Sequence, residues 1–167
     1  MSEIQDTDFE NLGGGPQRIL IQPGIYPARF LTRKSDRRRK DWGEKLIFEW
    51  EVYLNATKTQ SKRLSRYYNA NRDKAGRFDF GDGHDYRADW IRANGGKHPL
   101  VWNRLPITIF EAGEFLVEVV TVTRDWRRPL EPTFHHSKID RIIRPVNDGE
   151  IFLKLPVQLP ELIDEMG

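Results

Sequence analysis

Three stretches of the sequence place Lys and Arg beside aromatic residues, the combination that a protein surface needs to bind single-stranded nucleic acid. Cations follow the phosphates, and flat rings stack on bases whatever the base sequence, at about 1–3 kcal/mol per base. We therefore take as candidate nucleic-acid-binding residues Arg37, Arg38, Arg39, Lys40 and Trp42; Arg63, Arg66, Tyr67, Tyr68 and Arg72; and Trp126, Arg127 and Arg128.

The aromatic residues of these stretches have competing explanations. Trp42 follows four basic residues and has few apolar neighbours in the sequence, so burial does not obviously account for it. Its ring could instead fold back onto the protein with arginines stacked on it. Tyr67 and Tyr68 are adjacent, and neighbouring side chains of a strand point to opposite faces, so at most one can stack on a base. Trp50 is expected in the core.

The sequence gives less support to a catalytic or metal-binding function. Asp79, Asp82, His84 and Asp85 could suggest a divalent-ion loop, but their spacing is not that of an EF-hand, and helix starts often collect aspartates. The sequence contains no phosphate-binding loop, GxSxG or HExxH motif. We therefore predict a binding protein without catalytic residues, metal or cofactor. A hydrolase built on these four residues is the least favoured alternative.

Charge is distributed unevenly along the 167 residues. Residues 1–16 carry four acids and residues 155–167 carry three, with no base in either segment, so the residues between them hold all 27 Lys and Arg against 18 acids. This predicts a flexible acidic arm (1–16), a basic domain (17–154) and an acidic C-terminal tail (155–167). A basic body suits a polyanionic partner, although a well-solvated basic surface would have the same composition.

Composition also bears on location. Cysteine is absent, which excludes disulfides and Cys-ligated zinc. No apolar stretch approaches the roughly 18 residues of a membrane helix, and the N-terminus lacks a basic start and an apolar run. We expect a cytoplasmic protein with no membrane partner.

Hydrophobic periodicity predicts a β-rich domain. The clearest pattern is the alternation from Lys45 to Leu54, which is typical of a half-buried strand. A helix is expected where apolar residues share one face and two glycines follow. In chain order we expect strands at 24–33, 45–54 and 63–70, a helix at 84–94, a hairpin of strands 105–110 and 115–123 around 111–114, and a last strand at 138–144.

This element order is that of the OB-fold, a five-stranded Greek-key barrel with a helix between its third and fourth strands. Over residues 24–124 the sequence resembles small OB-fold single-stranded DNA-binding proteins of bacterial replication and mobile elements. The resemblance implies an all-β fold with one short helix and an added C-terminal strand. It departs at residues 111–114, because OB-folds commonly use the loop between strands four and five as a binding finger, whereas this turn is short and acidic.

The resemblance implies sequence-nonspecific binding of single-stranded DNA in replication, recombination or DNA transfer, with RNA as an alternative ligand. Similar proteins often recruit protein partners through an acidic tail, so residues 155–167 are a candidate partner-binding segment; a docked turn or plain disorder is the alternative. Self-association stays open. A competing hypothesis is a structural or assembly adaptor of a phage or mobile element with no nucleic-acid role.

Overall fold

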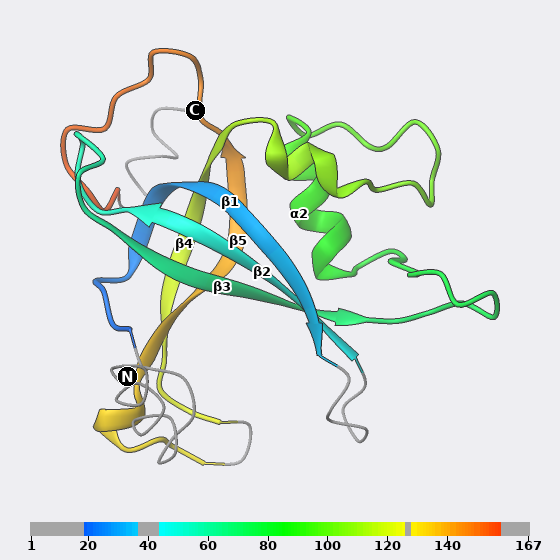
Figure 1. Ribbon diagram of the computed structural model, residues 1–167, viewed down its shortest axis with the longest axis horizontal. Coiled ribbons are helices and arrows are strands. Elements are labelled where there is room, and N and C mark those ends of the chain that lie inside the picture. The colour runs from blue at the N-terminus through cyan, green and yellow to red at the C-terminus, as the bar shows by residue number, and fades with distance from the viewer. Residues whose placement is uncertain (1–18, 37–43, 126–127, 158–167) are drawn as a thin grey trace, which may run out of the picture.

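The computed structural model describes residues 19–36, 44–125 and 128–157. This part of the chain is mostly β, with a single short α-helix and two 3-10 helices (Figure 1). In chain order the elements are β1 (Gly24–Asp36), β2 (Glu44–Tyr53), β3 (Ser61–Ala70), α2 (Asp85–Ala93), η2 (Ile107–Glu111), β4 (Glu114–Val122), η3 (Pro132–Phe134) and β5 (His136–Pro145).

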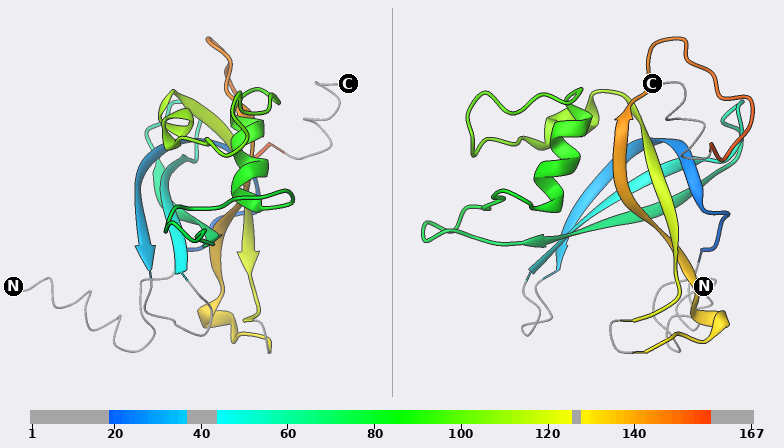
Figure 2. Two further views of the ribbon diagram at one scale, coloured as in Figure 1. Left: turned by 90° about the vertical axis from the view of Figure 1, so that its right-hand side faces the viewer. Right: turned by 180° about the vertical axis from the view of Figure 1, so that it is seen from behind.

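The five strands form one antiparallel sheet in the order β3-β2-β1-β4-β5. The sheet curls so that its two edge strands, β3 and β5, approach each other, and α2 lies beside them (Figures 1 and 2). Within the described residues β3 and β5 are not joined by a strand ladder, so the sheet remains open between them. The all-β class predicted from the sequence is confirmed.

Alternation explains the central strands. On β2 the side chains of Leu46, Phe48, Trp50 and Val52 are buried, while the residues between them are only half-buried. The predicted strand at 45–54 is thus confirmed, as are those at 24–33, 63–70 and 138–144 within longer limits. The core is aromatic, and its rings meet mainly edge to face, an arrangement that adds to the burial of apolar area.

The predicted helix at 84–94 is observed as α2, with the expected end signals. At its start, the Nδ1 atom of His84 accepts a hydrogen bond from the backbone N–H of Tyr86 at 3.0 Å. At its end, Gly95 and Gly96 both have positive φ, and the Gly96 N–H donates to the Ile91 carbonyl at 2.8 Å. The two glycines therefore supply the left-handed backbone that closes the helix.

The predicted hairpin of residues 105–110 and 115–123 is wrong. Residues Ile107–Glu111 form η2, and Gly113 does not have the positive φ expected of a turn glycine. Both edges of β4 are already occupied, by β1 on one side and β5 on the other, so no edge remains for a further strand. Phe110 instead inserts its fully buried ring into the core.

This correction changes the strand numbering. The fourth strand is β4, and the strand expected as an addition at 138–144 is the fifth strand of the sheet. The connection between strands four and five is therefore residues 123–135, and not the short acidic turn at 111–114.

The segment after β5 covers part of the sheet. Val157 pairs with Ile25 through two backbone hydrogen bonds of 2.8 and 2.9 Å, and these two residues pack with Leu116 in a small second core. The packed body therefore extends to Val157, beyond the expected boundary at residue 154. Because this segment covers the outward side chains near the start of β1 and on β4, the outward side of β2 and β3 is the more open part of the sheet.

In the ranges that the structure describes, no helix has the length and apolar character needed to cross a membrane.

Candidate nucleic-acid interface

The outward side of the sheet where β1, β2 and β3 run together forms an exposed polar surface, which we call the outer face. Strand register places its residues side by side: Tyr67 lies opposite Ile47, and Ile47 lies opposite Lys34 on β1. The outer face comprises Thr32, Lys34, Asp36, Lys45, Ile47, Glu49, Arg63, Ser65, Tyr67 and Asn69.

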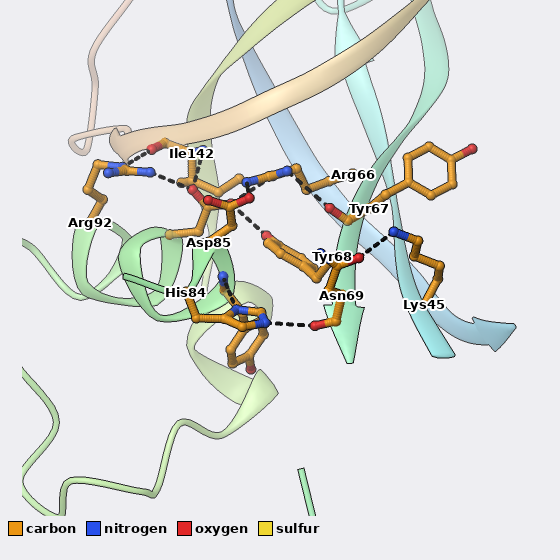
Figure 3. Close-up of polar contacts among 11 residues, drawn as sticks. Lys45, Arg66, Tyr67, Tyr68, Asn69, His84, Asp85, Arg92 and Ile142 are labelled. Carbon is orange, nitrogen blue, oxygen red and sulfur yellow. Dashed lines mark hydrogen bonds and ion pairs between the residues drawn. The ribbon is translucent and has the colours of Figure 1, made fainter. Parts of the chain in front are cut away.

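Tyr67 is the exposed ring of the outer face. Its side chain points away from the protein interior (Figure 3), and the residue is 46% exposed. Tyr68 points inward and is almost completely buried. The alternation expected for this pair is confirmed, and it leaves Tyr67 as the ring that can stack on a base.

Three cations, Lys34, Lys45 and Arg63, share the outer face with this ring. Glu49 is shared by two of them: the Lys34 Nζ atom lies 3.0 Å from Oε2, and the Arg63 Nη1 atom lies 3.3 Å from Oε1 in an ion pair without hydrogen-bond geometry. Lys45 donates to the neutral side chain of Asn69 (Figure 3). The side chains of Lys34 and Arg63 are themselves 58% and 60% exposed, so a phosphate can approach both cations while they stay close to the largely buried Glu49 carboxylate. Lys34, Lys45 and Arg63 outnumber the two acids of the face.

Arg66 does not belong to this surface, contrary to the sequence-based expectation. Its guanidinium is buried, and its Nε atom donates to Asp89 Oδ2 at 2.9 Å. The hydroxyl of Tyr68 donates to the same oxygen at 2.7 Å (Figure 3). Both residues are therefore held inside the molecule and are not available to nucleic acid.

The other oxygen of Asp89 completes a bridge between three elements. It accepts hydrogen bonds from Arg92 Nη2 at 2.7 Å and from the backbone N–H of Ile142 at 3.0 Å, while Arg92 Nε donates to the Ile142 carbonyl (Figure 3). The fully buried carboxylate thus links α2 to β3 and to β5, the two edge strands that lack a ladder between them.

Burial and the neighbouring charges shift the pKa values of Arg66 and Tyr68. Burial, the largest single influence, lowers the pKa of Arg66, but Asp89, Tyr68 and Asp85 together raise it by more, so the net shift is upward. Burial, reinforced by Asp89, raises the pKa of the Tyr68 hydroxyl well above its ordinary value. Arg66 therefore stays charged and Tyr68 stays a neutral donor.

Arg72 is engaged within the protein. Its guanidinium donates to both carboxylate oxygens of Glu44 at 2.8 and 3.0 Å and to the Gly76 carbonyl at 2.7 Å, and it lies over the Phe78 ring at 4.2 Å. These contacts secure the turn after β3 to the start of β2. Arg72 has a structural role there and is not a free cation.

The remaining candidates belong to two connections between strands. Arg128 lies in the connection between β4 and β5, where it is exposed and its N–H donates to Asp125 Oδ1 at 3.2 Å. The other candidates lie outside the described residues: Arg37, Arg38, Arg39, Lys40 and Trp42, between β1 and β2, and Trp126 and Arg127, next to Arg128.

Sequence reasoning missed Trp102. This residue lies between α2 and η2, is 52% exposed, and places its ring over the Arg87 guanidinium at 3.8 Å. The available signal was the run of Leu100, Val101 and Trp102 between two prolines, where a turn-rich segment has no periodic face to bury.

The acidic stretch before α2 has structural partners. His84 Nε2 lies 2.7 Å from the Asn69 carbonyl oxygen, and Asp85 lies 4.0 Å from Arg66. The described residues contain no group of three or more His, Asp or Glu side chains placed to hold a metal ion.

Comparison with known proteins does not assign the chain to a family: no family model matches it, and no curated protein or solved structure matches it.

Proposed function

We propose that this protein binds single-stranded nucleic acid, in the first place DNA, without sequence preference and without catalysing a reaction. The observation that carries the proposal is the exposed Tyr67 ring on the outer face, which also carries Lys34, Lys45 and Arg63. Stacking on a ring and neutralisation of phosphates are the two contributions that hold a single strand on a sheet.

We further propose that the fold is an open form of the OB barrel. Support comes from the strand order and from the helix between β3 and β4. The Asp89 bridge joins β3 to β5, the edges that a closed barrel would pair. OB-folds bind nucleic acid on the face of strands two and three and through the loops between strands one and two and between strands four and five.

Those two loops correspond here to residues 37–43, which connect β1 to β2, and 123–135, which connect β4 to β5. They contain the remaining candidates, Arg37, Arg38, Arg39, Lys40 and Trp42 in one and Trp126, Arg127 and Arg128 in the other. We include them in the proposed interface. The proposal also comprises a cytoplasmic role in replication, recombination or DNA transfer, with the acidic C-terminal tail as the segment that recruits a protein partner.

Replacement of Tyr67 by alanine tests the stacking contribution. We expect Tyr67→Ala to weaken binding of an unstructured oligonucleotide by about 1–3 kcal/mol, roughly 5- to 150-fold in Kd, because the base loses its platform. Stability should change by less than about 1 kcal/mol, since the ring is largely exposed and lies outside the core. Fluorescence anisotropy gives the Kd, and thermal unfolding gives the stability.

Two matched variants make this result specific. Tyr67→Phe keeps the ring and should keep nearly all of the affinity; Leu153→Ala removes an exposed apolar side chain from the segment after β5 and should leave binding unchanged. Equal losses for Tyr67→Ala and Tyr67→Phe would show that the hydroxyl, and not the ring, makes the contact. Unchanged binding by Tyr67→Ala would remove Tyr67 from the interface.

A further inference from the structure

A second feature of the protein is a pocket of about 200 Å³ beside α2. It is lined by residues from the end of β1, the start of β2, α2 and the two long connections on either side of the helix. Figure 1 shows α2 and these two connections on its right-hand side. Aromatic side chains form much of its wall. The ring centroids of Phe78 and Phe80 lie 5.8 Å apart with nearly parallel ring planes, and those of Phe80 and Tyr86 lie 4.3 Å apart.

Arg87 is a buried cation in the wall of this pocket. The residue is only 4% exposed. Its Nε donates to the Phe80 carbonyl at 2.7 Å and its Nη2 to the Trp102 carbonyl at 2.6 Å, so it fastens both long connections to α2. Its Nη1 atom is buried and has no hydrogen-bond partner in the described part of the chain.

Among the residues that the structure describes, no Asp or Glu lines the pocket to compensate the charge of Arg87, and both oxygen partners of Arg87 are neutral carbonyls. A second cation, Arg33, is exposed and also lines the pocket, opposite Phe48 in the strand register. Burial raises the pKa of the Tyr86 hydroxyl, and the Arg33 charge acts in the opposite direction.

A purely structural role explains two of the three nitrogen atoms of Arg87. The Trp102 ring, 3.8 Å from the guanidinium, adds a cation–π contact, but it gives Nη1 no hydrogen-bond acceptor and supplies no full negative charge. A buried charge without such a partner is costly. A bound anion would supply both the acceptor and the opposite charge. The aromatic wall adds a preference for a ligand that also carries a flat ring.

We propose that this pocket binds a nucleotide, with the base against Phe78 and Phe80 and the phosphate on Arg87 and Arg33. An apolar cavity of about 150 Å³ holds one benzene ring, so this pocket has room for one base, and the ribose and phosphate of the nucleotide would extend toward the exposed Arg33. The nucleotide can be free or can belong to a bound strand. The site is distinct from the outer face and does not require that face to bind nucleic acid.

The test is calorimetric titration of the full-length protein with adenosine monophosphate, adenosine and inorganic phosphate. We expect saturable binding of the monophosphate, at least roughly tenfold weaker binding of adenosine, and still weaker binding of phosphate alone, because ring and anion each contribute. No saturable binding of the monophosphate, or equal affinity for adenosine, would overturn the proposal.

Variants connect the binding to the two arginines. Arg33→Ala should weaken monophosphate binding roughly tenfold while the protein stays folded, because Arg33 is exposed. Arg87→Gln should weaken it further, and because Arg87 also secures two connections, the melting temperature of this variant is measured beside its affinity. Lys154→Ala removes an exposed cation from the segment after β5, which does not line the pocket, and should leave the affinity unchanged. Full affinity in Arg33→Ala contradicts the proposal on its own.

Competition with an oligonucleotide distinguishes the two sources of the nucleotide. Displacement of the monophosphate by the oligonucleotide would mean that the strand places one of its own nucleotides in the pocket; simultaneous binding would mean that the ligand is a free nucleotide. The two proposals fail separately, because Tyr67→Ala affects oligonucleotide binding on the outer face, whereas Arg33→Ala affects the free monophosphate in the pocket.

Discussion

Asp89→Asn is expected to destabilise the protein by about 3–5 kcal/mol, because it leaves a buried cation without its counterion. Asp89 is fully buried and accepts hydrogen bonds from Arg66, Tyr68, Arg92 and the Ile142 backbone. The amide has the same size but carries no charge, and its nitrogen would face groups that are themselves donors. For a protein of this length the loss corresponds to a fall in Tm of roughly 10 °C. Calorimetric or circular-dichroism melting measures it.

Asp85→Asn is the matched control for this variant. Asp85 also lies near Arg66, at 4.0 Å, but its side chain is 74% exposed. Its removal should cost less than about 1 kcal/mol, mostly through a weaker interaction with the start of α2. If Asp89→Asn and Asp85→Asn cost the same, Asp89 does not join the helix to the two edge strands in the way described.

Trp50→Ala is expected to have a comparable effect, about 3–5 kcal/mol, through a cavity in the core. Trp50 is completely buried on β2, and its ring meets Phe30, Phe110 and Phe115 edge to face at 5.5, 6.1 and 5.9 Å. These residues come from β1, η2 and β4, so the cavity would weaken the contacts of several elements at once. Chemical denaturation reports the change in the free energy of unfolding.

Trp50→Phe separates the volume of the ring from its polar atom. The indole Nε1 atom is buried without a hydrogen-bond partner in the described residues, so its removal relieves an unsatisfied donor while the phenyl ring fills much of the space. We expect a loss below about 1.5 kcal/mol. A loss in Trp50→Phe as large as that in Trp50→Ala would mean that the shape of the indole, and not buried apolar volume, dominates the energetics at this site.

The sequence predicted those elements whose signals are local. The alternation along β2 reports directly which side of the strand is buried, and the two glycines after residue 94 mark the end of α2. Residues 105–110 also carry apolar side chains, yet the chain forms η2 at Ile107–Glu111 and no strand. A further strand would need a free edge of the sheet, and β1 and β5 occupy both edges of β4. Edge occupancy depends on residues far apart in the chain, and local periodicity does not contain it.

The same distinction applies to the candidate interface. Alternation predicted that only one of Tyr67 and Tyr68 faces outward, and the structure shows that it is Tyr67. Arg66 resembles a surface cation in the sequence because its partner, Asp89, lies 23 residues further along the chain. The environment of Arg87 likewise comes from two separate connections, so its unpartnered nitrogen becomes visible only in the folded protein.

The central claim is that the protein binds single strands by stacking, and one titration tests it most directly. Fluorescence anisotropy at physiological salt compares a labelled unstructured oligonucleotide with a duplex of the same length. We expect the single strand to bind at least about tenfold more tightly, because only unpaired bases can stack on Tyr67, whereas phosphate contacts are available in both. Equal or tighter binding of the duplex, or no binding of either, would contradict the account.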